Sequence, residues 1–211
     1  KISGYDEVKV VVLKGAKATL KAVREALRKA PKCETFLFYF SGKGATVQKK
    51  DKVVQYLVLS DSKRGRLADT SIALPELIQL TDAIDCKGGL LIIDAGFNNG
   101  EEGRTISPQD AKVRLPSEYV GVSKSKRAVI IACTSNQTAG VSPIVKHGLF
   151  SYYLLKVMQG KVDVDKNKNG ALEVSELYHY LRTKVTDQTN ERQAPVLLGK
   201  GTDVKLLWKK K

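Results

Sequence analysis

The sequence is poor in cysteine and has no long apolar run. Its three cysteines, Cys33, Cys86 and Cys133, are an odd number without CxxC spacing, so we expect neither a disulfide framework nor a zinc site. This cysteine usage favours a reducing, cytoplasmic compartment. No stretch approaches the roughly 18 to 20 consecutive apolar residues that cross a bilayer, which excludes a membrane span in this segment. The chain begins at Lys1 without a methionine, so a signal peptide further upstream would not be visible.

Acidic residues are scarce relative to basic ones: 22 Asp and Glu stand against 36 Lys and Arg, a net charge of +14. Such a charge suits nucleic acid, anionic lipid or an acidic partner, or simply a solvated surface. Basic residues gather at Lys49, Lys50 and Lys52, at Lys124, Lys126 and Arg127, and at Lys209 to Lys211. Aromatic residues are not interleaved with these clusters, as a surface that stacks single-stranded bases requires. A solvated surface is therefore favoured, and a basic nucleic-acid-binding module stays an alternative.

Short apolar runs alternate with segments of helical spacing along the whole chain. The pattern predicts strands over residues 6–13, 35–41, 53–59, 89–94 and 128–133, with a last short strand over 204–208. It predicts helices after Thr19 as N-cap and over 74–83, 149–158 and 174–185. This alternation indicates an α/β fold with a mostly parallel sheet covered on both faces. Because sites in such sheets form beyond the carboxyl ends of strands, the loops after Phe40 and Ile93 are the candidate site.

Four blocks of the sequence resemble those of bacterial caspase-like cysteine peptidases, relatives of caspases and metacaspases. The blocks are FYFSGKG (38–44), LLIIDAGFNNG (90–100), AVIIACTSNQTA (128–139) and HGLFSYYLLKVMQGKVD (147–163). The resemblance covers nearly the whole chain and implies one caspase-like domain over residues 1–211, a three-layer sandwich with a mostly parallel six-stranded sheet. The family has a further central strand upstream of the region that starts here at Lys1, so we expect that first strand to be missing from this segment.

The resemblance places Lys43 where the family has its catalytic histidine, in SGHG, and Gly96 where it has its cysteine, in DAC. The family's reaction needs a thiolate nucleophile and a base that titrates near neutral pH. Glycine has no side chain to form an acyl intermediate, and a lysine ordinarily titrates about four pH units above a histidine. The chain is therefore interpreted as an inactive pseudopeptidase, acting as a binding, scaffold or regulatory module. Its expected partner is a peptide or protein, with a homodimer or a heterodimer with an active relative as further possibilities.

Two residues of the implied substrate pocket remain. In metacaspase-like relatives the acid two residues before the cysteine lines a pocket for basic side chains, and Asp94 matches it. The other interpretation is that Asp94 accepts backbone hydrogen bonds at the strand end. Cys133 matches a strand beside the pocket, which leaves open an active cysteine-type endopeptidase with displaced chemistry and Arg or Lys specificity. Cys33 and Cys86 precede their strands, at the opposite end of the sheet.

Residues 165–176, DKNKNGALEVSE, fit the loop of an EF-hand, which binds calcium. The predicted oxygen ligands are Asp165, Asn167, Asn169, Ala171 through its carbonyl, Glu173 and Glu176. Lys166 and Lys168 would lower the affinity, and no second EF-hand is visible to pair with it. The loop therefore either binds a calcium ion, the one cofactor that the sequence indicates, or is held by Asx-turns alone.

Overall fold

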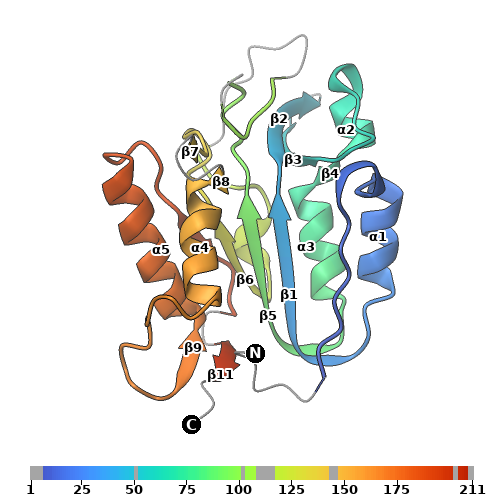
Figure 1. The fold of residues 1–211 in the computed structure, drawn as a ribbon. Helices are drawn as coiled ribbons and strands as arrows, with labels where there is room; N and C mark the ends of the chain where they lie inside the picture. Colours follow the sequence, from blue (N-terminus) through green and yellow to red (C-terminus); the bar gives the residue numbers. More distant parts are fainter. Residues whose placement is uncertain are drawn as a thin grey trace.

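A central sheet organises the computed structural model, which describes residues 7–49, 52–100, 103–107, 117–142, 147–201 and 204–208. The strands of this sheet are β1 (Cys33–Ser41), β5 (Cys86–Asp94), β6 (Ala128–Ile131) and β10 (Val196–Leu198), in the order β1-β5-β6-β10. β1, β5 and β6 are parallel, and β10 is antiparallel to β6. The predicted α/β fold with a mostly parallel sheet is confirmed (Figure 1).

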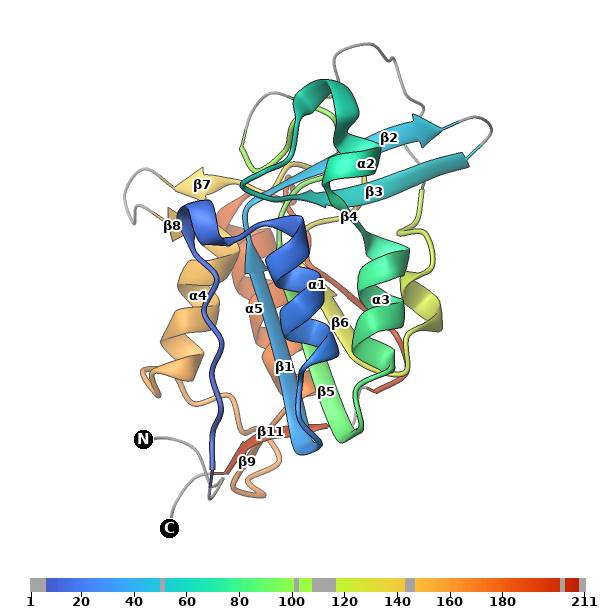
Figure 2. The ribbon, with the colours of Figure 1, turned by 90° about the vertical axis from the view of Figure 1, so that its right-hand side faces the viewer.

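Helices cover both faces of this sheet. α1 (Leu20–Arg28) and α3 (Leu74–Asp82) lie on one face, and α4 (Leu149–Met158) and α5 (Val174–Gln188) lie on the other (Figures 1 and 2). Successive residues of β5 pack on opposite faces of the sheet. Leu91 belongs to the core cluster with α1 and α3, and Leu90 belongs to the cluster with α4 and α5. A strand buried on both sides needs a continuous apolar sequence, which is why the run at 89–94 does not alternate with polar residues.

Local signals in the sequence set where these helices begin. The Thr19 hydroxyl accepts a hydrogen bond from the Ala22 amide at 3.2 Å, so Thr19 is the N-cap of α1 as predicted. Pro75 lies in the first turn of α3, where its missing N–H leaves no helical hydrogen bond unmade. Short helical turns connect the larger elements: η1 (Gly15–Lys17), η2 (Arg64–Arg66), α2 (Leu67–Thr70) and η3 (Val122–Lys124).

Smaller sheets surround the central one and account for two predicted strands. β2 (Lys43–Lys49), β3 (Lys52–Val58) and β4 (Ile72–Ala73) form an antiparallel sheet, so the strand predicted at 53–59 does not join the parallel sheet. β11 (Lys205–Trp208) forms as predicted but pairs with β9 (Ala171–Glu173), and β7 (Val141–Ser142) pairs with β8 (His147–Gly148). The central sheet of the described chain therefore has four strands instead of six.

The strand predicted over residues 6–13 does not form in the described residues, which begin at Glu7. Residues 7–14 lack strand pairing, and Val8, Val10 and Val12 are 60%, 72% and 73% exposed. Only Leu13 of this run packs against the core. A β-branched sequence favours a pleated, half-buried position, but the strand needs a neighbour to hydrogen-bond with it.

The expectation of no disulfide is wrong. Cys33 and Cys86 form one, with Cα atoms 4.7 Å apart, and Cys133 is a buried free thiol. The pairing follows from the register of the parallel strands, which sets Cys33 directly beside Cys86 at the start of β1 and β5. The cysteine usage therefore no longer argues for a reducing compartment. Within the described ranges, no helix has both the length and the apolar character of a membrane span.

Candidate functional site

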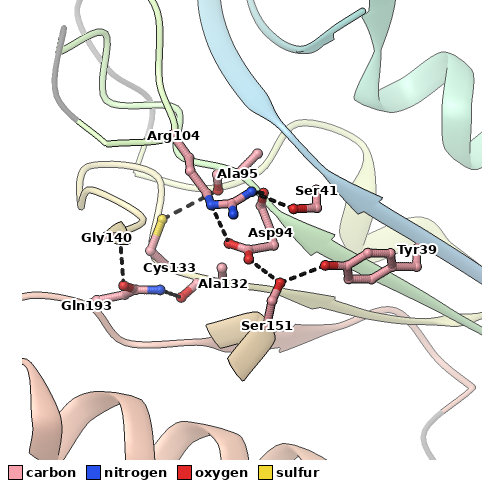
Figure 3. Close-up of polar contacts among 10 residues, drawn as sticks. All are labelled: Tyr39, Ser41, Asp94, Ala95, Arg104, Ala132, Cys133, Gly140, Ser151 and Gln193. Atoms are coloured by element: carbon pink, nitrogen blue, oxygen red, sulfur yellow. Dashed lines mark hydrogen bonds and ion pairs between the residues drawn. The ribbon is translucent and has the colours of Figure 1, made fainter. Parts of the chain in front are cut away.

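The candidate site lies where β1 and β5 end side by side (Figure 3). Ser41, the last residue of β1, is in register with Asp94, the last residue of β5. The Gly42 amide donates to the Asp94 carbonyl oxygen at 3.2 Å, which closes the end of the sheet. The two loops that the sequence singled out therefore do meet at the same edge.

Asp94 is a fully buried carboxylate at this edge. The Ser151 hydroxyl of α4 donates a short hydrogen bond to Asp94 Oδ2, and the Tyr39 hydroxyl lies 2.7 Å from Ser151 Oγ. Arg104 Nε lies 3.5 Å from Asp94 Oδ1, and neither of these two atoms has a hydrogen-bond partner. Burial raises the pKa of Asp94, and the Arg104 charge and the Ser151 hydrogen bond oppose that rise. The carboxylate is thus stabilised by the Arg104 cation and by Ser151, through both its hydroxyl and its backbone.

Arg104 fills the space against Asp94 with its guanidinium group, and its side chain is 17% exposed. Nη1 donates to Ser41 Oγ at 2.5 Å and lies 3.4 Å from the Asp94 carbonyl oxygen. A Cβ atom on Gly148 would approach Arg104 Nε to 2.7 Å and would also contact the Asp94 carboxylate. The absence of a side chain at position 148 therefore makes room for this ion pair.

The main chain of Arg104 is bound as well as its side chain. Its carbonyl oxygen accepts hydrogen bonds from the Gly96 amide at 2.7 Å and from the Gly44 amide at 3.1 Å. Its own amide donates to the Ala139 carbonyl oxygen at 3.1 Å, and the Ile106 amide donates to the Gly44 carbonyl oxygen at 2.9 Å. Two amides that converge on one carbonyl oxygen at these distances have the geometry that stabilises an oxyanion in acyl-transfer sites.

The two predicted dyad positions meet beside this carbonyl group. Lys43 is the exposed first residue of β2, and Gly96 is buried just after β5. Gly44 packs so closely that a Cβ atom there would collide with the Gly96 carbonyl oxygen. A Cβ atom on Gly96 would lie 3.1 Å from the Ala139 nitrogen and 3.5 Å from the Arg104 carbonyl oxygen. A side chain at position 96 would therefore stand next to the Arg104 carbonyl group; the correspondence with the family's dyad stays a prediction.

Cys133 lies close to the site but is shielded from it. The residue is fully buried, its Sγ lies 3.5 Å from the Gln137 carbonyl oxygen, and burial raises the pKa of its thiol to about 12. The Tyr119 hydroxyl donates to the Cys133 carbonyl oxygen at 2.7 Å. A thiol that stays protonated and has no access to solvent is not a nucleophile.

The EF-hand-like loop lies away from this site, ahead of α5. Its side chains accept hydrogen bonds from the loop backbone: Asp165 from Asn169 and Gly170, and Glu176 from Lys166. Glu173 and Glu176 form the capping box of α5, and the Ala171 amide donates to Asn169 Oδ1. The described residues hold no group of three or more His, Cys, Asp or Glu side chains arranged for a metal ion. Calcium binding through Asp165, Asn167, Asn169, Ala171, Glu173 and Glu176 stays a prediction.

The basic clusters are only partly surface features. Arg127 is 5% exposed and donates to the carbonyl oxygens of Thr81 and Ile84 at 2.9 and 2.6 Å, so it belongs to the interior. Lys50 and Lys209 to Lys211 lie outside the described residues. The interpretation of Lys124, Lys126 and Arg127 as a solvated basic cluster is therefore wrong for Arg127.

The sequence did not single out four residues of the site. Tyr39, Gly148 and Ser151 lie within the blocks that resemble caspase-like peptidases, so those blocks held the available signal. Arg104 lies in the polar stretch after the second block, where neither periodicity nor a motif marks it. Its placement against Asp94 depends on the path of the loop.

Comparisons with known proteins agree with this architecture. The solved structure of protein GSU0716 from Geobacter sulfurreducens superposes with a TM-score of 0.57 at 16% sequence identity, over 86% of this chain and 73% of that chain, which shows a shared fold. A search of curated proteins found no match. A family model described as the caspase domain, Peptidase_C14, matches residues 3–206. With a match over nearly its whole length, the chain belongs to the caspase-domain family of C14 peptidases.

Proposed function

We propose that this caspase-domain chain binds peptide or protein segments without hydrolysing them, as a binding, scaffold or regulatory module. One observation carries the proposal. The Gly96 amide donates a hydrogen bond to a peptide carbonyl group, that of Arg104 in this chain, while position 96 has no side chain that could attack this group. The site therefore combines amide donors suited to a peptide carbonyl with a missing nucleophile. The neighbouring Lys43 adds a solvent-exposed cation instead of an imidazole.

Cysteine peptidase activity with displaced chemistry is the alternative, and the surroundings of Cys133 and Ser41 argue against it. Cys133, the free thiol of the described chain, is buried with a raised pKa. The Ser41 hydroxyl accepts a hydrogen bond from the Arg104 guanidinium group, a cation that cannot take up its proton. A nucleophile needs a base within hydrogen-bond reach, whereas the contacts described for these two groups are with a guanidinium group and with backbone carbonyl oxygens.

A hydrolysis assay tests the proposal directly. Fluorogenic peptides that end in arginine or lysine are incubated with the chain from about pH 5 to about pH 9, with and without calcium. We expect no turnover above that of the heat-denatured chain. The control variant Asp94→Asn removes the carboxylate that faces the guanidinium, so any turnover that disappears in this variant comes from the site and overturns the proposal.

Calcium responsiveness is a finer part of the same proposal and rests on the 165–176 sequence. The side-chain oxygens of Asp165 and Glu176 accept hydrogen bonds from backbone amides of the loop. Calcium binding would add bonds from these side chains to the ion. A calcium titration by calorimetry tests the idea, with Glu176→Gln as the variant that lowers the ligand charge. Equal heats for the chain and the variant would reject it.

A further inference from the structure

We infer that residues 103–106 are a built-in occupant of the peptide site, that Arg104 is the residue the site recognises, and that an arginine-containing peptide binds only by displacing it. The inference rests on the proposed function, because it names the ligand class and the regulation of that same site. The evidence is that Arg104 contacts the site with its main chain and with its side chain at the same time.

The main chain of the segment is held on two sides, as a bound peptide is. On one side the Arg104 carbonyl oxygen accepts from Gly44 and Gly96, and the Ile106 amide donates to Gly44. On the other side the Arg104 amide donates to Ala139. Extended peptides bind in this way when their main chain pairs with an exposed backbone, while a pocket reads one side chain.

Gln193 holds the loop at 139–140 in place, and Figure 3 shows its contacts with Gly140 and Ala132. Gln193 is 1% exposed, its Oε1 accepts from the Gly140 amide at 2.9 Å, and its Nε2 donates to the Ala132 carbonyl oxygen at 2.9 Å. This bridge ties the loop at 139–140 to the end of β6. The peptide acceptor at Ala139 is therefore positioned by the fold, independently of residues 103–106.

The pocket for the side chain fits a guanidinium group. Nη1 of Arg104 reaches Ser41 Oγ and approaches the Asp94 carbonyl oxygen while Nε faces the carboxylate, which uses several donors of one planar group. A lysine ammonium is a single point charge and cannot make these contacts together. The pocket also requires glycine at position 148. We therefore assign the site a preference for arginine over lysine.

The resident ion pair is incomplete, which leaves room for a better ligand. Asp94 is fully buried, yet its Oδ1 accepts no hydrogen bond, and Arg104 Nε donates none. A carboxylate at such a site normally accepts aligned N–H donors at shorter distances than 3.5 Å. An arginine on a separate peptide is free of the constraints that residues 103–106 impose, so it can align with Oδ1.

A peptide must then compete with Arg104 for the same atoms. The apparent affinity of the chain falls in proportion to the fraction of molecules in which the segment has withdrawn. Removing the Arg104 side chain leaves Asp94, Ser41 and the main-chain donors available. The variant should bind an arginine peptide more tightly than the unmodified chain does.

The test measures binding of a fluorescein-labelled peptide, Ala-Ala-Arg-Ala with blocked ends, to the chain and to Arg104→Ala by fluorescence anisotropy. We expect a gain of about tenfold or more in Arg104→Ala, a smaller gain for the lysine version of the peptide, and loss of the gain in Asp94→Asn/Arg104→Ala. Arg104→Lys keeps a positive charge beside Asp94 and replaces Arg104→Ala in the assay if the alanine variant does not fold. Its gain in peptide affinity over the unmodified chain should be smaller. Circular dichroism verifies the fold of each variant.

Two results overturn the inference and separate it from the proposed function. If the unmodified chain binds the arginine peptide as tightly as both Arg104 variants do, the segment does not close the site, but a peptide-binding function stands. If no folded variant binds the arginine peptide, the site does not recognise arginine. In that case a peptide array without arginine tests the proposed function separately. The proposed function also fails if the unmodified chain binds none of these peptides.

Discussion

Replacing Arg104 with alanine should cost the fold a free energy that grows with pH. The substitution removes the cation that faces the buried Asp94 carboxylate and leaves the Ser151 hydroxyl as the remaining side-chain donor to it. Burial already raises the pKa of Asp94, and Arg104 is the nearby cation that opposes this rise. Without Arg104, the pKa of Asp94 therefore rises further.

The size of the loss follows from the burial of the pair. Removing one partner of a buried ion pair costs about 3–5 kcal/mol of folding free energy. Asp94 is fully buried while the Arg104 side chain is 17% exposed, so the lower end of that range applies. We expect a loss of about 3 kcal/mol where Asp94 is ionised.

The sign of the pH dependence follows from proton linkage. A carboxyl group whose pKa is higher in the folded chain than in the unfolded chain binds protons on folding, so stability falls as pH rises through the folded-state pKa. The larger upward shift in Arg104→Ala extends this fall to higher pH. The difference from the unmodified chain should be small near the ordinary pKa of an aspartate and largest above the raised pKa of Asp94.

Urea denaturation at about pH 4 and about pH 8, at one salt concentration and with the disulfide intact, measures this difference. Asp94→Asn and the double variant Asp94→Asn/Arg104→Ala complete the cycle, since asparagine does not titrate. In the Asp94→Asn background, the effect of removing Arg104 should lose its pH dependence. An equal loss at both pH values in the Asp94 background would refute the reasoning, because it would show a packing effect instead of an uncompensated charge.

Three further predictions concern the rest of the described chain. Cys33→Ser/Cys86→Ser should lower the free energy of unfolding by up to about 4 kcal/mol, from the entropy of a loop with sequence separation 53; an unchanged urea midpoint would contradict this. Cys133 should resist alkylation at about pH 8 in the folded chain and react on unfolding, because burial raises its pKa to about 12; rapid labelling of the native chain would reopen the displaced-chemistry alternative. Gly148→Ala should cost about 1–3 kcal/mol, since its Cβ would press on Arg104 Nε at 2.7 Å, whereas the control Gly140→Ala meets only Gln193 at 3.4 Å; equal melting temperatures would argue against the tight packing.

The sequence by itself determined the elements whose signals are local. The uninterrupted apolar run at 89–94 predicted a strand buried on both faces, and β5 is one. Thr19 and Pro75 marked the starts of α1 and α3, because a capping hydroxyl and a proline act within one helical turn. The family blocks also brought Asp94 and Gly96 to attention, and the structure places Asp94 against the Gly42 amide and Gly96 against Gly44 at the end of the sheet.

Only the tertiary structure decided which distant residues meet. Cys33 pairs with Cys86 because two strands adopt one parallel register, and spacing along the chain carries no trace of that register. The valines after Glu7 have the composition of a strand but find no partner among the described strands, and Arg127 looks like a surface cation but donates to buried carbonyl groups. Arg104 reaches Asp94 from a loop without a motif. Local periodicity encodes helices and strands, whereas these contacts depend on the register of strands and the path of loops, which the folded chain sets as a whole.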